Sequence, residues 1–415
     1  MPAPRSSDDR LTPLLERELR ANPAYRLVLF DRLESAERAA LAGLADGPDF
    51  YGLLRPAAGF GLGVKSVCRE TALLFLTLRE PGPLPAYVRA LYGSEAPRLV
   101  ARLVADGILE IAGGGGFVSG AGALDLLAPP AVGGIGAAGT AGAAGESQPA
   151  GGDPAQGQPA RGRLGALSLA ALRYGARLAL DDPFALSLRL YGYNTLPLTP
   201  DWQRRLPSAE QVEGFLGIAP GGPHRKLLDG NFGAAGRDGA WLSWNARAPG
   251  PRSGRATFKL YVSPRPEALP ALAGDLLAGL AAARPSAFKL GSAAAGLLRP
   301  DKIVAYFPSF EALAAAAEPL ARRLAGAPVQ GVPFTSEMAG DGLLSWGADP
   351  PAEPSFPGFD GESWRLWLTH RLARALVQAR AAGDGEPWRF ALARLDLEGV
   401  DPVTWTPRAG VFRAS

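Results

Sequence analysis

The chain has 415 residues, of which 47% are hydrophobic, and its 43 basic and 40 acidic residues leave a formal net charge of only +3. This length predicts two globular domains rather than one core, and so small a basic excess does not favour a nucleic-acid partner. The single cysteine, Cys68, excludes an internal disulfide and is typical of a protein from a reducing compartment.

No secretory signal and no apolar run of membrane-spanning length is apparent, so we expect a soluble, cytoplasmic protein without a membrane partner. The two histidines, His224 and His370, do not cluster with Cys68 or with carboxylates. The sequence therefore predicts neither a metal site nor a cofactor.

The N-terminal part predicts helices followed by a small hairpin. Periodicity and Pro/Gly boundaries place, in chain order, two amphipathic helices in 9–45, a strand at 61–67, helices starting at 71, 85 and 96, and hairpin strands at 108–111 and 117–119. Three short helices followed by a hairpin indicate a winged-helix domain, which we assign to residues 1–124.

Residues 125–163 consist mainly of Gly, Ala and Pro. Such a segment cannot bury enough apolar surface to become ordered, and it predicts a flexible linker. A second domain then covers 164–415. Its expected helices are 167–180, 183–190, 269–283, 310–324 and 364–381, and its expected strands are 241–245, 255–262, 287–290 and 302–307. This pattern predicts an α+β fold with helices over a mostly antiparallel sheet.

Lysine is rare in this chain. Of the 43 basic residues only five are lysine, and four of them fall between 226 and 302: Lys226, Lys259, Lys289 and Lys302. Lysine differs from arginine because its pKa can fall far enough for it to act as a base. The clustering therefore suggests a specific chemical use, with Lys226 and Lys302 as possible substrate contacts.

Two strands carry a Phe-Lys-Leu run. In RATFKLYV, alternation places Thr257, Lys259 and Tyr261 on one face. In SAFKLG, Lys289 occupies the equivalent position, and Arg299 follows. Cations gathered in one sheet favour a multiply charged anion as ligand, or a neutral lysine among them. A phosphate dianion bound beside a neutral lysine would meet both of these requirements. That arrangement suits β-elimination of phosphate from phosphoSer or phosphoThr, which needs a base, fixed cations and a proton donor.

These residues resemble two related groups of proteins. One is the phosphothreonine lyases of bacterial type III secretion, which carry an F-K-x-H strand and a second F-K strand followed by an arginine. The other is the HopA-type effector family and its relatives in class V lanthipeptide and thioamitide biosynthesis. The resemblance covers roughly 165–415 and includes RLYGYNTLPLTPDW, FKLY, RPDKIVAYF, GVPFTSE and LLSWGADPP.

The resemblance implies roles for individual residues. Lys289 matches the general base, Lys259 a phosphate-binding lysine, and Arg299 a phosphate-binding arginine. Arg365, in the Ser-Trp-Arg run, matches a second such arginine. The implied reaction is phosphate elimination that yields dehydroalanine or dehydrobutyrine in a ribosomal precursor peptide.

The proton donor departs from the family pattern, because Tyr261 stands where the family has histidine. Three alternatives are open. We favour Tyr261 as the acid, because strand alternation places it beside Lys259. The other two are that a histidine from elsewhere enters the site and that the domain binds without catalysis. His224, in a predicted loop, is the histidine that would reach the site, whereas His370 beside Arg371 is interpreted as a surface or capping residue.

The first domain resembles the PqqD-like leader-binding domains of peptide-modifying enzymes, on the run TALLFLTLREPGPLPAYVRALYG. The implied partners are a phosphorylated precursor peptide, bound through leader and core, a separate Ser/Thr kinase, and a cyclase as a further candidate. The alternatives are a non-catalytic binding partner of the kinase or cyclase, and a winged-helix DNA-binding regulator. The predicted third helix offers only Arg98 and Arg102, a poor basic footprint for DNA.

Overall fold

The computed structural model describes residues 10–41, 50–57, 63–127, 162–238, 240–247, 258–338, 340–350, 362–383 and 385–408. The chain forms two compact units. Unit 1 comprises Met1–Gly157 and Ala375–Glu398, and unit 2 comprises Gln158–Arg374 and Gly399–Ser415. The sequence does not predict that a C-terminal segment packs with the N-terminal unit, and the predicted linker at 125–163 lies almost wholly outside the described residues.

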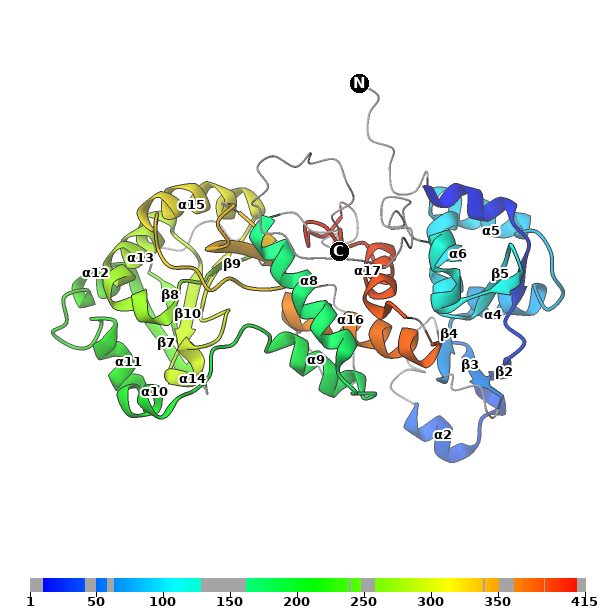
Figure 1. Cartoon of the computed structure of the whole chain (residues 1–415), viewed down its shortest axis with the longest axis horizontal. Coiled ribbons are helices and arrows are strands. Elements are labelled where there is room, and N and C mark those ends of the chain that lie inside the picture. Colours follow the sequence, from blue (N-terminus) through cyan, green and yellow to red (C-terminus); the bar gives the residue numbers. More distant parts are fainter. Residues whose placement is uncertain are drawn as a thin grey trace, which may run out of the picture. The chain divides into compact units, whose positions relative to one another are not determined.

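Unit 1 contains two three-stranded antiparallel sheets and a set of short helices (Figure 1). The strands are β1 (Leu19–Ala21), β5 (Leu109–Gly113) and β6 (Gly116–Val118) in one sheet, and β2 (Tyr25–Leu29), β3 (Gly52–Pro56) and β4 (Lys65–Val67) in the other. The helices are α2 (Ser35–Ala40), α4 (Arg69–Thr77), α5 (Ala86–Tyr92), α6 (Ala96–Ala105), α7 (Leu124–Leu127) and α17 (Pro387–Leu397).

The three helices α4, α5 and α6 and the β5–β6 hairpin occur in the predicted order. The prediction of two helices in 9–45 is wrong in its first half, where a 3₁₀ turn at Thr12–Glu16 leads into β1. The leucines that suggested a helix are buried instead by this turn and by pairing of Leu19 with Ile111. The winged-helix assignment itself stays a prediction.

Unit 2 is built on one seven-stranded antiparallel sheet with the order β12-β13-β9-β11-β10-β8-β7. Its strands are β7 (Phe232–Asp238), β8 (Trp241–Ala246), β9 (Phe258–Val262), β10 (Ala287–Gly291), β11 (Ile303–Phe307), β12 (Ser336–Glu337) and β13 (Leu344–Ala348). Its helices are α8 (Gly162–Arg177), α9 (Pro183–Tyr191), α10 (Pro200–Arg205), α11 (Ala209–Phe215), α12 (Arg225–Asn231), α13 (Leu269–Ala283), α14 (Ala294–Leu297) and α15 (Phe310–Arg323), and α16 (Trp364–Ala381) begins in it. The predicted α+β class with mostly antiparallel sheets is confirmed.

Local sequence explains where several of these helices begin. Asp182, Thr199 and Ser309 are N-caps, and each side chain accepts a hydrogen bond from a backbone N–H in the first turn. Pro183 and Pro200 follow the first two caps, where the missing N–H costs nothing. The sequence predicted α13 and α16 with the bounds that the structure has.

The core of unit 2 lies between the sheet and the helices α13 and α15, which cover one of its faces (Figure 1). The side chains from the strands that share this core face are Leu242, Trp244, Leu260, Val262, Phe288, Leu290, Ile303, Phe307 and Leu344. Alternation along the strands therefore sends the intervening residues to the opposite face. In the described ranges, no helix combines the length and apolar character needed to cross a membrane.

Candidate functional site

The face of the sheet opposite the core carries the residues that the sequence singled out. Lys259 pairs directly with Tyr306 of β11, while Tyr261 pairs with Val304. Val304 in turn pairs with Lys289 of β10. Residues directly opposite one another in neighbouring strands point to the same face. The structure therefore brings both lysines and Tyr261 to one surface, which we call the polar face; Thr257 lies outside the described residues.

Aromatic rings separate the cations on the polar face. The ring centre of Tyr306 lies 6.0 Å from the Nζ of Lys259 and 5.9 Å from the Nζ of Lys289. The ring of Trp241, from β8, lies 4.1 Å from the Nζ of Lys289. Because the face of an aromatic ring attracts a cation, these rings allow like charges to stand close together.

Lys259 also has a carboxylate partner. Its Nζ donates to Oδ1 of Asp349, which follows the end of β13. The lysine side chain is 13% exposed and the aspartate side chain 36% exposed. An anion that binds Lys259 must therefore compete with Asp349 for the ammonium.

A close backbone contact sets the position of Arg299. A Cβ atom added to Gly291, at the end of β10, would lie 2.4 Å from the backbone carbon of Gly296 in α14. Only glycine permits this approach. It packs α14 against the strand, so that Arg299 lies with its guanidinium carbon 5.0 Å from the centre of the Trp241 ring.

Arg299 is held by a buried carboxylate. Its Nε donates to Oδ1 of Asp301 at 2.9 Å and its Nη2 to Oδ2 at 3.0 Å. Nη2 also donates to the hydroxyl of Tyr191 at 2.9 Å. Burial disfavours ionisation of Asp301, but the guanidiniums of Arg365 and Arg299 outweigh it and hold the pKa of this carboxyl below its ordinary value.

Arg365 takes part in the same network but from a buried position. It is 1% exposed, and its Nη1 forms an ion pair with Oδ2 of Asp301 at 2.9 Å. Its Nε donates to the carbonyl of Pro333 and its Nη2 to the carbonyl of Tyr191. Because its side chain is almost fully buried, Arg365 stabilises the network and offers no exposed donor to a ligand.

The two tyrosines of the polar face differ in accessibility. Tyr261 is 3% exposed, and burial raises its pKa well above the ordinary value. Tyr306 is half-buried, and burial together with the charge of Asp349 raises its pKa to about 12. Both phenols keep their proton at neutral pH, but Tyr306 is the more accessible of the two.

Lys302 lies away from this surface. It is fully buried, and its Nζ donates to the carbonyl of Pro264 at 2.9 Å and to Oε1 of Gln330 at 2.7 Å. Burial lowers its pKa to about 7. A neutral amine has two N–H donors, which match these two acceptors. We therefore remove Lys302 from the candidate substrate contacts.

The histidines and Lys226 also lie elsewhere. His224 immediately precedes α12 and packs against Gly274 of α13, on the helical layer that covers the core face. Lys226 is exposed on α12. The expectation that His370 is a surface or capping residue is wrong: it is fully buried, and its Nδ1 lies 2.7 Å from Oε1 of Glu362. Neither histidine joins the lysines.

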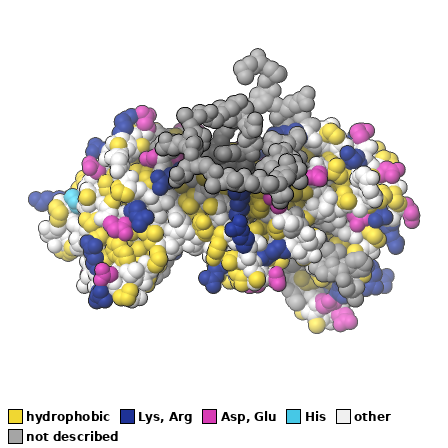
Figure 2. Space-filling view, viewed as in Figure 1, with side chains coloured by type: hydrophobic (Ala, Val, Ile, Leu, Met, Phe, Trp, Pro, Cys, Tyr) yellow, Lys and Arg dark blue, Asp and Glu magenta, His cyan; other side chains and the backbone are white. Residues whose placement is uncertain are grey.

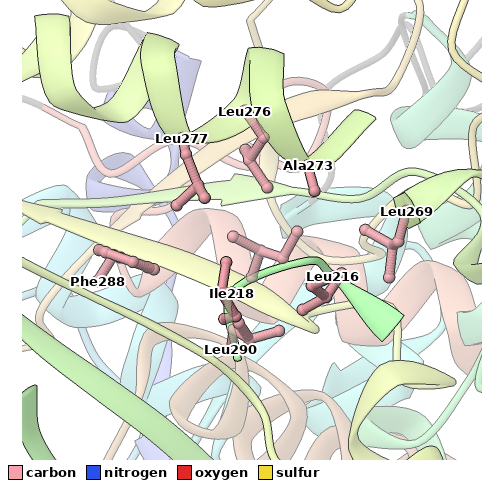
Figure 3. Close-up of a pocket in the computed structure, with 9 residues that line it drawn as sticks. Leu216, Ile218, Leu269, Ala273, Leu276, Leu277, Phe288 and Leu290 are labelled. Atoms are coloured by element: carbon pink, nitrogen blue, oxygen red, sulfur yellow. The ribbon is translucent and has the colours of Figure 1, made fainter. Parts of the chain in front are cut away.

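A cavity of about 20 Å³ in unit 2 lies in the core and not at this site. Figure 3 shows Leu276, Leu277 and Ala273 of α13 pointing toward Leu216 and Ile218. Its lining is entirely apolar, and it is too small for an organic ligand. We interpret it as a packing defect of the core.

Five residues at the polar face were missed by sequence reasoning: Tyr191, Trp241, Asp301, Tyr306 and Asp349. Two of them could have been found from the sequence. Trp241 and Tyr306 alternate with core residues along their strands, which predicts that they lie on the face opposite the core. Asp301 stands between Arg299 and Lys302 in the sequence, where an acid among bases suggests an ion pair.

The polar face favours an anionic ligand. Among the described residues, four basic side chains, Lys259, Lys289, Arg299 and Arg365, outnumber the two carboxylates, Asp301 and Asp349. A phosphate dianion suits such a surface. Among the described residues no group of three or more His, Cys, Asp or Glu side chains is placed to hold a metal ion.

No protein-family model matches this chain, and no curated protein matches it. Among solved structures, an effector protein from Pseudomonas syringae pv. tomato strain DC3000 aligns with a TM-score of 0.38 and 13% identity, over 58% of this chain and 97% of that chain. An effector from Pseudomonas syringae pv. syringae strain 61 aligns with a TM-score of 0.36 and 14% identity, over 60% of this chain and 100% of the other. Both TM-scores lie below 0.5, so these likenesses assign no chemistry to this chain.

Proposed function

We propose that unit 2 is a lyase that removes phosphate from phosphoSer or phosphoThr in a peptide. One observation carries the proposal: Lys259 and Lys289 flank Tyr306 on a single face of the sheet, and Lys289 and Arg299 approach the same Trp241 ring. Three cationic side chains that reach one surface from three different segments suit a dianion better than a single carboxylate.

In the proposed reaction Lys289, as the free amine, takes the proton from Cα of the phosphorylated residue. The electron pair of the broken C–H bond forms the Cα=Cβ double bond, and the Cβ–O bond breaks as phosphate leaves. Lys259 and Arg299 neutralise the charge that develops on the leaving phosphate. The products are a dehydroamino acid in the peptide and free phosphate, and no redox step or cofactor is needed.

The proton for the leaving oxygen comes from a phenol in this proposal. Tyr261 occupies the sequence position that the resemblance points to, but its hydroxyl is closed off from solvent. Tyr306 lies between the two lysines and is partly exposed. We therefore propose Tyr306 as the direct donor, with Tyr261 supporting the network beneath it.

The biological substrate in this proposal is a ribosomal precursor peptide that a separate Ser/Thr kinase has phosphorylated, with a cyclase acting afterwards. Unit 1 would bind the leader of that peptide. In support, β6 is an edge strand of its sheet among the described residues, and an edge strand is able to pair with an added peptide strand. A linked leader site raises the local concentration of the core peptide at unit 2.

The experiment is to incubate the protein with a Ser/Thr-containing precursor peptide that a Ser/Thr kinase has phosphorylated. The proposal predicts a mass loss of one phosphoric acid per modified site, with release of inorganic phosphate. Complete retention of phosphate by a peptide that binds the folded protein would contradict it.

A non-catalytic phosphopeptide-binding partner is the second candidate, favoured by the tyrosine that replaces the family's histidine. It predicts tight binding without turnover. A DNA-binding regulator has less support: on the face drawn in Figure 2, basic side chains are interspersed with acidic and apolar ones and form no continuous basic surface.

A further inference from the structure

Asp301 is the most heavily engaged carboxylate of unit 2 among the described residues. It is 4% exposed, yet four polar groups from three other side chains reach it. They are Nε and Nη2 of Arg299, Nη1 of Arg365 and the hydroxyl of Tyr191, at distances of 2.9, 3.0, 2.9 and 3.0 Å. A buried carboxylate is costly unless its partners satisfy it fully, and here they do.

Asp301 holds the guanidinium of Arg299 in a defined orientation. A carboxylate that binds the Nε–Nη2 edge of a guanidinium fixes the plane of the group as well as its position. Nη1, with its two N–H donors, has no hydrogen bond to any described residue. The Arg299 side chain is 27% exposed, whereas that of Arg365 is 1% exposed.

The two arginines therefore have different parts in the network. Arg365 is 1% exposed; its Nε and Nη2 donate to backbone carbonyls, and its Nη1 forms an ion pair with Asp301. Arg299 uses two nitrogens on protein groups and stands over the same Trp241 ring as Lys289. If Asp301 served stability alone, the buried Arg365 would be a sufficient partner, and the partly exposed Arg299 would not be needed.

We propose that Asp301 is a positioning residue: by holding the Nε–Nη2 edge of Arg299 it presents Nη1 beside Lys289 to the phosphate of the substrate. Tyr191 supports the same arrangement, since its hydroxyl donates to Asp301 and accepts from Nη2 of Arg299. This inference rests on the proposed function for the identity of the anion, but its geometry concerns anion binding and not the elimination step.

The test is a double-mutant cycle on anion binding. Calorimetry measures the affinity for inorganic phosphate, and for a synthetic phosphothreonine peptide against its unphosphorylated form. The samples are the full chain as wild type, Asp301→Asn, Arg299→Ala and the double variant. Arg299→Ala should weaken phosphate binding about tenfold or more, the amount typical of a lost charged hydrogen bond. Asp301→Asn should cost a similar factor, and the double variant should be no weaker than Arg299→Ala alone.

Removing a buried anion that pairs with two arginines is destabilising, so a second variant is needed in case Asp301→Asn does not fold. Tyr191→Phe provides a milder second cycle, because it deletes one hydroxyl and leaves both ion pairs. It should weaken phosphate binding about two- to fivefold in the wild type, and have no effect in the Arg299→Ala background. Asp229→Asn is the matched control, since this carboxylate pairs with Arg225 on α12, away from the polar face.

Additive effects of Asp301→Asn, or of Tyr191→Phe, with Arg299→Ala would overturn the inference, as would absence of phosphate binding by the wild type. An elimination assay on the same samples separates the two proposals. If the substitutions have non-additive effects on phosphate affinity but no elimination occurs, the role of Asp301 is supported and the lyase proposal is contradicted. If elimination occurs and the effects on affinity are additive, only the role of Asp301 is contradicted.

Discussion

The Nζ of Lys289 lies 4.1 Å from the centre of the Trp241 ring, and the guanidinium carbon of Arg299, which follows α14, lies 5.0 Å from the same centre. Trp241 thus lies close to both the candidate base and a candidate phosphate ligand. Trp241→Ala should lower the elimination rate about tenfold or more, because both cations lose a ring that restrains them. Trp241→Phe keeps an aromatic face and should recover most of that loss. Equal effects of the two substitutions on single-turnover rates would argue against this role.

Substitution of the two tyrosines should affect the elimination rate to different extents. Tyr306→Phe removes the accessible proton donor and should slow elimination by about a hundredfold or more, whereas Tyr261→Phe should stay within about tenfold of wild type. With the pKa of Tyr306 at about 12, its ionisation should cause no loss of rate between pH 6 and 10. The measurement is phosphate release at several pH values, and a larger effect at Tyr261 would restore the assignment made from the sequence.

The ion pair between Lys259 and Asp349 should compete with substrate. Asp349→Asn removes the competing carboxylate and should tighten phosphate binding about two- to fivefold, the range expected of a partly exposed ion pair. Titration with inorganic phosphate at low and high salt measures this. Weaker binding in Asp349→Asn would mean instead that the carboxylate orients Lys259 for the ligand.

Lys302 should give unit 2 a pH-dependent stability. Its pKa is about 7 when folded, against 10.5 as the ordinary value. Between pH 7 and 10.5 the unfolded chain therefore keeps the Lys302 proton that the folded protein has lost. The free energy of unfolding consequently rises as the pH increases through this range. Below pH 7 both states are protonated, and the folded state bears the full cost of the buried charge, at most about 4–5 kcal/mol.

Lys302→Met removes this titration and should flatten the rise between pH 7 and 9, while stabilising the protein most at pH 6 to 7. Urea unfolding of the two proteins at several pH values measures the difference. Asp301 and Glu267 favour the charged lysine and Arg265 disfavours it. A wild-type stability that falls over this range, while the variant is unchanged, would contradict the assignment.

Much of unit 2 follows from local pattern. Alternation in the two Phe-Lys-Leu runs placed Lys259 and Lys289 on the polar face, because a strand leaves each side chain only two directions. The alanine-rich periodicity of α13 likewise fixed its bounds. β13 was missed because its Leu-Ser-Trp-Gly-Ala run is buried on both faces and shows no alternation.

The network around Asp301 could not be predicted in the same way. It depends on the packing of α9 and α16, which carry Tyr191 and Arg365 from positions over 60 residues away in the chain. Near the N-terminus, leucines at helical spacing were misleading, because a 3₁₀ turn and a strand bury them equally well. Short segments satisfy more than one periodicity, and tertiary pairing then decides.

The most direct test of the lyase proposal is mass spectrometry of a kinase-treated precursor peptide after incubation with wild type, Lys289→Ala and Lys289→Arg. We predict that the wild type removes one phosphoric acid per site. Both variants should be inactive, although they bind the phosphopeptide within about tenfold of wild type, because neither alanine nor a permanently charged arginine accepts the Cα proton. Elimination by Lys289→Arg at a rate near that of wild type, or retention of every phosphate by the wild type with bound peptide, would contradict the proposal.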